Sequence, residues 1–525
     1  MSRIAKAALV VSAGILASRV LGLLRNVAVA ALLGDTTDGD LYQAAFVLPD
    51  LLFYLMAGGY LSITFIPILS ERMAADDEDG AWAAFASVAK AVGATMVVLT
   101  VVAWVAAPSI VSWVFGRLPA LAGDGATAIP EADLAELANL VRIVLPAQLF
   151  FMLGSLLMGV QYARDRFVIP SLAPVVYNLG IILGGLIGWW SGVEGPAGFL
   201  WGALVGAAAG NFALQVWGAR RAGLRWVTGP VRSPALRAYL LMALPLMLGQ
   251  SVAILDEQLI RVAGQLGPEG SIATLGLARN LVMVPVGLIA QAAGVAAYPT
   301  LARLVAEGAF DDMRETLTRA LRGVVLFGGF ASAAVLAASQ PAVAVVYQRG
   351  AFGVDATVAT AAALVWYALA IPFWGGHQLL GRAFYAHRRM WVPVGIGTVV
   401  TIVVIPLYFG IEGLMGAQGI ALASTVAISL YTVALGVAWF REHGGWGPVW
   451  DAAWRTALAT AVASVGSWFV IDGIVGAPAE GTLGRATLGL VVGAVTVTAL
   501  YAVSLRVLRV PELASVGTRL RDRLG

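Results

Sequence analysis

The sequence contains no cysteine, which excludes disulfides, thiolate catalysis and cysteine metal sites. Charged residues are also scarce: they make up 12% of the chain, about half of the roughly 25% found in soluble domains. Lysine occurs only at Lys6 and Lys90, so there is no Walker A motif and ATP-driven pumping by this chain is excluded. The three histidines are scattered without metal-ligand spacing, and no paired aspartate motif of a membrane glycosyltransferase stands out. We therefore predict that the chain is not an enzyme.

Hydrophobic residues make up 60% of the 525 residues, and the mean hydropathy is +0.85. Apolar runs of about 20 residues, the length that crosses a bilayer, recur with short polar breaks. The start of the chain resembles a secretory signal peptide, but its apolar pattern continues to Leu33, so we interpret it as the first membrane span. The pattern predicts about fourteen spanning helices: 8–33, 41–69, 84–115, 139–162, 168–190, 196–218, 238–264, 272–301, 318–339, 357–385, 391–411, 417–440, 452–475 and 484–508.

Basic residues alternate along the predicted connections. If the N-terminus is cytoplasmic, the cytoplasmic connections and the tail carry nearly all the arginines, including Arg164, Arg166, Arg220, Arg221, Arg225, Arg303, Arg314, Arg388, Arg389, Arg506 and Arg521. The opposite connections hold little beyond Arg117, Arg349 and Arg485. The positive-inside rule then predicts a multi-pass protein with both termini in the cytoplasm. The net charge of +3 is explained by this topology, so no nucleic-acid partner is predicted.

Two short motifs recur six predicted helices apart. Tyr162–Pro170 matches Tyr385–Pro393, and Pro67–Ala74 matches Pro299–Ala306. These matches predict an all-α polytopic membrane protein with two six-helix lobes, related by a parallel pseudo-two-fold repeat, and two extra C-terminal helices. The predicted lobes are residues 1–225 and 226–445, followed by helices 13 and 14 and a basic tail in residues 446–525. Duplicated bundles of this kind predict alternating access around a site between the halves.

The first predicted helix carries a polar face in an otherwise apolar surface. At 100° per residue, an arc of roughly 140° contains Ser12, Ser18, Arg19, Gly22, Arg25 and Asn26. A guanidinium deep in hydrocarbon costs at least about 2.5–3.5 kcal/mol, so two on one face indicate a water-filled cavity that receives an anion. In the alternative interpretation, one arginine reaches the interface or pairs with an acid.

Acidic residues near the second and seventh helices have two interpretations each. Asp40 could balance the arginine face, or it could be an outer-loop carboxylate or a helix cap. Asp256 and Glu257 could bind a coupling sodium ion or a proton, or they could belong to a structural network at the rim, where Glu257 and Arg261 are spaced to pair. In the second helix, Pro49 and Gly58-Gly59 predict a break or bend.

The eighth predicted helix holds Arg279 and Asn280. By the repeat it is the counterpart of the second helix, so Arg279 could face Arg19 and Arg25 across the cavity. The expected substrate-binding set is therefore Arg19, Arg25, Asn26, Asp40, Arg279 and Asn280. The glycine pairs Gly184-Gly185 and Gly375-Gly376 predict close helix packing.

Several collinear motifs resemble those of the MurJ (MviN) family of bacterial lipid II flippases. They are Ser18-Arg-Val-Leu-Gly22-Leu-Leu-Arg25, Leu48-Pro-Asp-Leu-Leu52, Phe65-Ile-Pro-Ile-Leu69, Arg166-Phe-Val-Ile-Pro170 with Asn178, Tyr347-Gln-Arg-Gly-Ala-Phe352 and Ala383-Phe-Tyr-Ala386. The resemblance implies a two-lobed fold of the MATE/polysaccharide-flippase superfamily. It also implies that the chain moves lipid II, an undecaprenyl-diphosphate-linked peptidoglycan precursor, to the outer leaflet of the bacterial inner membrane. Arg19 and Arg25 match family arginines assigned to the anionic head group, and helices 13 and 14 match a pair that forms a groove for the lipid tail.

The chain departs from the family pattern at several positions. Asn26 stands where the family has an acid, Phe53-Tyr54 and Gly58 replace a basic pair and an acid, and Arg279-Asn280 inverts the usual order. Arg389 replaces a sodium-linked carboxylate. No cofactor is expected; transport would be coupled to sodium or driven by the membrane potential. The expected partners are lipid II, membrane lipids and cell-wall synthesis machinery, with the chain itself a monomer.

Three alternative functions remain open at this point. The chain could move another polyprenyl-diphosphate glycan. It could be a MATE-like antiporter for small cations, which predicts an acid-rich cavity and conflicts with the basic face of the first helix. It could also be a non-transporting scaffold of envelope synthesis, which would tolerate neutralised arginines.

Overall fold

The computed structural model describes residues 3–55, 61–120, 127–227, 230, 232–249, 251–476 and 482–511. Within these ranges the chain is helical and contains no strand, as the apolar runs predicted. The side chains of residues 3–12, 61–64, 120, 244–249, 251–254, 290–299 and 412 are not described. The bend expected at Gly58-Gly59 falls outside the described residues.

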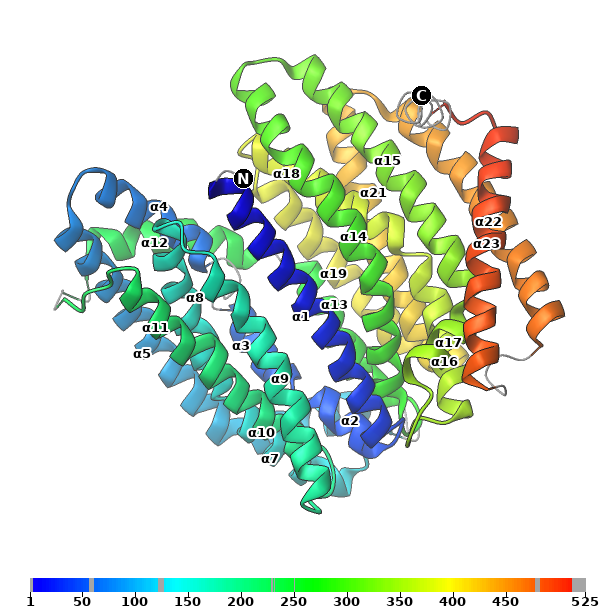
Figure 1. Cartoon of the computed structure of the whole chain (residues 1–525), viewed down its shortest axis with the longest axis horizontal. Coiled ribbons are helices and arrows are strands. Elements are labelled where there is room, and N and C mark those ends of the chain that lie inside the picture. Colours follow the sequence, from blue (N-terminus) through cyan, green and yellow to red (C-terminus); the bar gives the residue numbers. More distant parts are fainter. Residues whose placement is uncertain are drawn as a thin grey trace. The chain divides into compact units, whose positions relative to one another are not determined.

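The chain divides into two compact units. Unit 1 consists of Met1–Gln250, Gln265–Ala273 and Arg349–Ala351, and unit 2 of Ser251–Gly264, Thr274–Gln348 and Phe352–Gly525. Unit 1 contains α1 (Arg3–Leu33), α2 (Thr37–Ala44), α3 (Val47–Leu55), α4 (Leu61–Ala74), α5 (Glu78–Val111), η1 (Ser112–Arg117), α6 (Leu118–Ala120), η2 (Glu131–Asp133), α7 (Leu134–Val144), α8 (Ala147–Ala163), α9 (Val168–Trp190), α10 (Ala197–Gly206), η3 (Ala207–Ala213), α11 (Leu214–Arg221) and α12 (Pro234–Gly249) (Figure 1).

Unit 2 holds the remaining helices, except that η4 and the first turn of α14 cross the division between the units. These helices are α13 (Ser251–Ala263), η4 (Gly264–Leu266), α14 (Ser271–Ala306), α15 (Phe310–Ala337), α16 (Ser339–Tyr347), α17 (Val354–Ala368), α18 (Ile371–Ala386), α19 (Trp391–Gly410), α20 (Glu412–Met415), α21 (Ala417–His443), α22 (Trp446–Val475) and α23 (Leu483–Val507). The predicted lobe boundaries at residues 225 and 445 remain predictions.

Eleven helical stretches in the described ranges are long and apolar enough to cross a membrane. The count becomes 12 if α17 and α18, which bend by 43° at their junction, form one span. The chain is thus a multi-pass membrane protein, but the predicted number of fourteen is not confirmed. The predicted spans 41–69 and 238–264 fall on the shorter helices α2 to α4 and α12 to α13. In the first of these, Pro49 lies in the first turn of α3, where a proline is tolerated, so a new helix begins there.

Glycines bring α9 and α10 into close contact in unit 1, which confirms the close helix packing predicted from the Gly184-Gly185 pair. A Cβ atom on Gly184 would lie 2.5 Å from the Gly202 Cα, and one on Gly202 would lie 2.3 Å from the Gly180 carbonyl oxygen. Gly198 and Gly206 continue the contact in the adjacent turns of α10. Small residues allow such approach in membrane proteins, where dispersion contacts and not hydrophobic burial drive helix association.

We expect Gly202→Val to destabilise unit 1 because the added side chain must displace the backbone of α9. Overpacking of this kind costs about 1–3 kcal/mol. The midpoint of thermal unfolding in lipid nanodiscs should fall by several degrees. The matched control is Gly395→Val in α19, where an added Cβ meets no atom within 4 Å. Equal midpoints for the two variants would show that the α9–α10 contact is looser than described.

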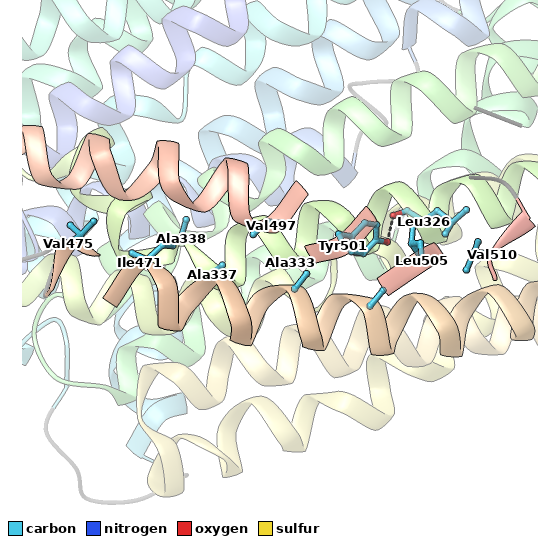
Figure 2. Close-up of a cluster of buried hydrophobic side chains, with 12 residues drawn as sticks. Leu326, Ala333, Ala337, Ala338, Ile471, Val475, Val497, Tyr501, Leu505 and Val510 are labelled. Atoms are coloured by element: carbon cyan, nitrogen blue, oxygen red, sulfur yellow. Dashed lines mark hydrogen bonds between the residues drawn. The ribbon is translucent and has the colours of Figure 1, made fainter. Parts of the chain in front are cut away.

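In unit 2, the C-terminal helices α22 and α23 pack on each other and on α15 (Figure 2). The buried cluster between them contains Ala333, Ile471 and Val497. Tyr501 on α23 donates its hydroxyl to the Leu326 carbonyl of α15 over 2.7 Å. The two helices after the predicted repeat are therefore firmly attached to unit 2.

Candidate functional site

Helix α1 carries two arginines in an apolar span and packs on α9 of unit 1. The Arg19 side chain is exposed, Arg25 is half-buried and Asn26 is buried. The Asn26 side-chain oxygen accepts hydrogen bonds from the Arg25 Nε atom at 3.2 Å and the Nη2 atom at 3.0 Å. The amide therefore orients the Arg25 guanidinium without neutralising it.

Neither Arg19 nor Arg25 has a carboxylate within ion-pair distance in the part of the chain that the structure describes. An uncompensated guanidinium in a membrane span is costly, and such residues mark substrate or ion pathways. Guanidinium groups also bind phosphate oxygens through paired hydrogen bonds. The described part of α1 therefore offers two positive charges suited to a phosphate-bearing ligand.

Asp40 acts as a helix cap, one of the two interpretations that its sequence position allowed. Its carboxylate is fully buried and accepts hydrogen bonds from the backbone N–H groups of Gly270 and Ala273, both at 2.7 Å. Gly270 directly precedes α14 and Ala273 lies in its first turn, where the backbone amides have no partner inside the helix. In return, Glu269 accepts hydrogen bonds from the backbone N–H and hydroxyl of Thr37, at the start of α2, at 2.8 and 2.9 Å. The two segments of unit 1 thus cap each other, and a role of Asp40 in substrate binding stays a prediction.

Acidic side chains surround a second feature of unit 1, a cavity of about 390 Å³ lined by Asp38, Glu194 and Phe199. Burial raises the pKa of the Asp38 carboxyl, and the negative charges of Glu194, Asp133 and Glu269 act in the same direction. An anionic ligand is disfavoured there. The arginine face of α1 is thus the better candidate for an anion site.

Aromatic rings occupy the positions of Phe53 and Tyr54, where the sequence departs from the pattern of the family that it resembles. The Phe53 ring lies 5.8 Å from that of Tyr54 and 5.8 Å from that of Phe151 on α8. Phe151 in turn contacts Tyr177 on α9, with ring centroids 5.0 Å apart. This part of unit 1 therefore presents aromatic surface instead of positive charge.

Arg279 belongs to a buried network within unit 2. Its Nη1 atom lies 2.8 Å from a carboxylate oxygen of Asp256, and both side chains are buried. The Tyr408 hydroxyl donates to the other Asp256 oxygen over 2.5 Å, and the Trp374 ring lies 5.4 Å from the guanidinium carbon. The charge of Arg279 is already balanced, so it must leave Asp256 before it can bind a substrate. Its expected position facing the α1 arginines stays a prediction.

The other candidate residues of unit 2 have partners or lie apart. Glu257 forms an ion pair with Arg261 at 2.6 Å, the i,i+4 contact that the sequence suggested. Asn280 is half-buried beside Arg279 in sequence, and Arg389 pairs with Glu442. These contacts are those expected of a structural network. They favour that interpretation of Asp256 and Glu257 over a site for a coupling ion.

Two residues of these networks were not singled out from the sequence. Tyr408 lies in an apolar run that gives no sign of a polar role, so only the folded structure brings it to Asp256. Glu269 precedes α14 in sequence but accepts its hydrogen bonds from Thr37 at the start of α2, 232 residues away. No local pattern could have predicted that role.

The family model described as "Lipid II flippase MurJ" matches residues 29–477 of the chain. Among curated relatives, a probable lipid II flippase MurJ of Rhizobium tropici is 28% identical over 451 residues, which cover 84% of this chain and 82% of the relative. The lipid II flippase MurJ of Burkholderia cenocepacia is 27% identical over 476 residues, covering 89% of each protein.

The fold is similar to those of solved transporters. A lipid II flippase MurJ in an inward closed conformation aligns with a TM-score of 0.74 at 20% identity, covering 95% of this chain and 99% of the other. An inward-facing multidrug resistance MATE transporter of the MOP superfamily aligns with a TM-score of 0.66 at 15% identity, covering 81% and 94%. The predicted superfamily fold is thereby confirmed.

Proposed function

This chain belongs to the lipid II flippase MurJ family, and we propose that it carries lipid II from the cytoplasmic to the outer leaflet by alternating access. The observation that supports this function most is the arginine face of α1. Arg25 is held by the neutral amide of Asn26, and Arg19 has no acidic partner among the described residues. A diphosphate supplies the negative charges that these two guanidinium groups lack.

The remaining parts of lipid II place different demands on the protein. The undecaprenyl chain is apolar and stays in the membrane, beside the α22–α23 pair that follows the predicted repeat. The sugar rings are polar on their edges and apolar on their faces, so the aromatic rings of Phe53, Phe151 and Tyr177 suit them better than charged side chains would.

The chain would lie in the bacterial inner membrane with both termini in the cytoplasm. It would act as a monomer that hands its substrate to cell-wall synthesis machinery.

We further propose that the membrane potential, and not sodium, drives transport. Asp256 is paired with Arg279 and Glu257 with Arg261, so a fixed guanidinium occupies the place of a coupling cation at each carboxylate. Moving an anion outward across an inside-negative membrane is favourable by about 2.3 kcal/mol per charge per 100 mV.

Replacing sodium by choline should therefore leave the export rate unchanged within twofold, whereas collapse of the membrane potential should lower the export rate. A loss of export in choline medium at constant potential would refute the proposal.

Complementation tests the function. Cells depleted of their own lipid II flippase should grow when this chain is expressed, and the fraction of lipid II in the outer leaflet should return to normal. If growth returns without a change in lipid II orientation, the chain acts as a scaffold. If neither returns although the protein is present in the membrane, the substrate is another carrier.

A further inference from the structure

Unit 2 contains a cavity of about 420 Å³ that none of the candidate substrate-binding residues lines. It lies between the junction of α15 and α16, helix α17, and the last turns of α22. Its volume falls in the range of about 300–1,000 Å³ typical of small-molecule sites. Figure 2 shows Ala337 and Ile471, two residues of its apolar wall, facing each other across the α15–α22 contact.

The lining combines an apolar wall with a short polar edge. The wall includes Val358 and Ala361 of α17 and Ile471 of α22, whereas the polar edge consists of Ser339, Gln340 and Asp472. Trp468 stands one helical turn before Asp472, and half of its surface is exposed. A ligand that fits must therefore be apolar along most of its length and polar at one end.

The negative charge of Asp472 on the polar edge indicates that the polar end of the ligand is positively charged. Asp472 is exposed and, in the ranges that the structure describes, has no ion-pair partner. Among the described residues that line the cavity, none is basic. An ammonium group between the Asp472 carboxylate and the face of the Trp468 ring would gain an ion pair and a cation–π contact together. Ser339 and Gln340 can donate hydrogen bonds to an adjoining phosphate.

We infer that this cavity binds an aminophospholipid, phosphatidylethanolamine, through its ammonium head group, with an acyl chain along α17 and α22. In the orientation proposed above, the C-terminal end of α22 lies at the outer leaflet, so the bound lipid belongs to that leaflet. Phosphatidylglycerol has a phosphate but no ammonium group, so it lacks the charge that Asp472 requires.

Native mass spectrometry of the full-length protein with equal amounts of the two phospholipids tests this site, without lipid II and so independently of transport. Wild-type protein should retain phosphatidylethanolamine about tenfold more than phosphatidylglycerol. Asp472→Asn should remove that preference, and Trp468→Leu should weaken it severalfold. The matched control is Asp311→Asn, which removes an equal charge from a carboxylate that is 93% exposed, and it should change nothing.

A second measurement uses only wild-type protein and does not depend on the folding of a variant. N-acetylated phosphatidylethanolamine keeps the phosphate and acyl chains but loses the positive charge, so its retention should fall to that of phosphatidylglycerol. Equal retention of the acetylated and free lipids would overturn the proposal, as would an unchanged preference in Asp472→Asn. Displacement of the bound lipid by undecaprenyl diphosphate would instead assign the cavity to the substrate tail.

Discussion

Replacing both Arg19 and Arg25 by glutamate should reduce lipid II export to below a hundredth of the wild-type rate. A hydrogen bond to a charged group contributes about 1.5–3 kcal/mol, so each arginine is worth roughly tenfold or more in diphosphate binding. Charge reversal adds repulsion to that loss. The measurement is the fraction of lipid II in the outer leaflet of flippase-depleted cells that express the variant.

Matched variants separate a lost anion site from a damaged helix. The Arg19→Lys/Arg25→Lys protein keeps both charges and should retain much of the export, although an ammonium group lacks the planar fork of a guanidinium. The Arg220→Glu variant reverses an exposed charge at the end of α11 and should export normally. Normal export by the double glutamate variant would show that the α1 arginines do not bind the substrate.

The second large effect concerns stability and the buried Asp256–Arg279 pair. Removing one partner of a buried ion pair leaves an uncompensated charge and costs about 3–5 kcal/mol. We therefore expect Asp256→Asn to lower the unfolding midpoint in lipid nanodiscs strongly. The double variant Asp256→Asn/Arg279→Gln should be more stable than the single one, since it leaves no buried charge unpaired.

An exposed pair on the same unit provides the control. Arg303 and Glu307 lie 2.9 Å apart with exposed side chains, and such pairs contribute about 0–1 kcal/mol. Glu307→Gln should therefore leave the unfolding midpoint nearly unchanged. If Asp256→Asn is as mild as Glu307→Gln, then water reaches Asp256 and a coupling ion could also bind there.

Much of the fold could be predicted because a bilayer constrains sequence strongly. Apolar length alone locates α9, which begins and ends at the predicted residues 168 and 190. The same criterion failed where the chain changes direction inside an apolar run. The predicted helix 41–69 is divided near Pro49, and the predicted helix 318–339 ends where Pro341 stands in the first turn of α16. Both breaks have a proline in the first turn of the new helix, a local signal that apolar length alone does not record.

The candidate site was predictable in its residues but only partly in its contacts. The polar arc of α1 follows from helical periodicity, so Arg19, Arg25 and Asn26 could be grouped before the structure was known. The hydrogen-bond partners of Asp40 and Asp256 could not be predicted from the sequence. Asp40 meets Gly270 across 230 residues and Asp256 meets Tyr408 across 152, and no local pattern specifies contacts at such separations.

The central claim is tested most directly by lipid II translocation in sealed liposomes that contain only the purified protein. Lipid II is supplied in one leaflet, and its appearance in the other is followed over time with an inside-negative potential imposed. We predict that wild-type protein moves lipid II at least a hundredfold faster than the Arg19→Glu/Arg25→Glu protein. Translocation no faster than in protein-free liposomes, or equal rates for the two proteins, would contradict the account.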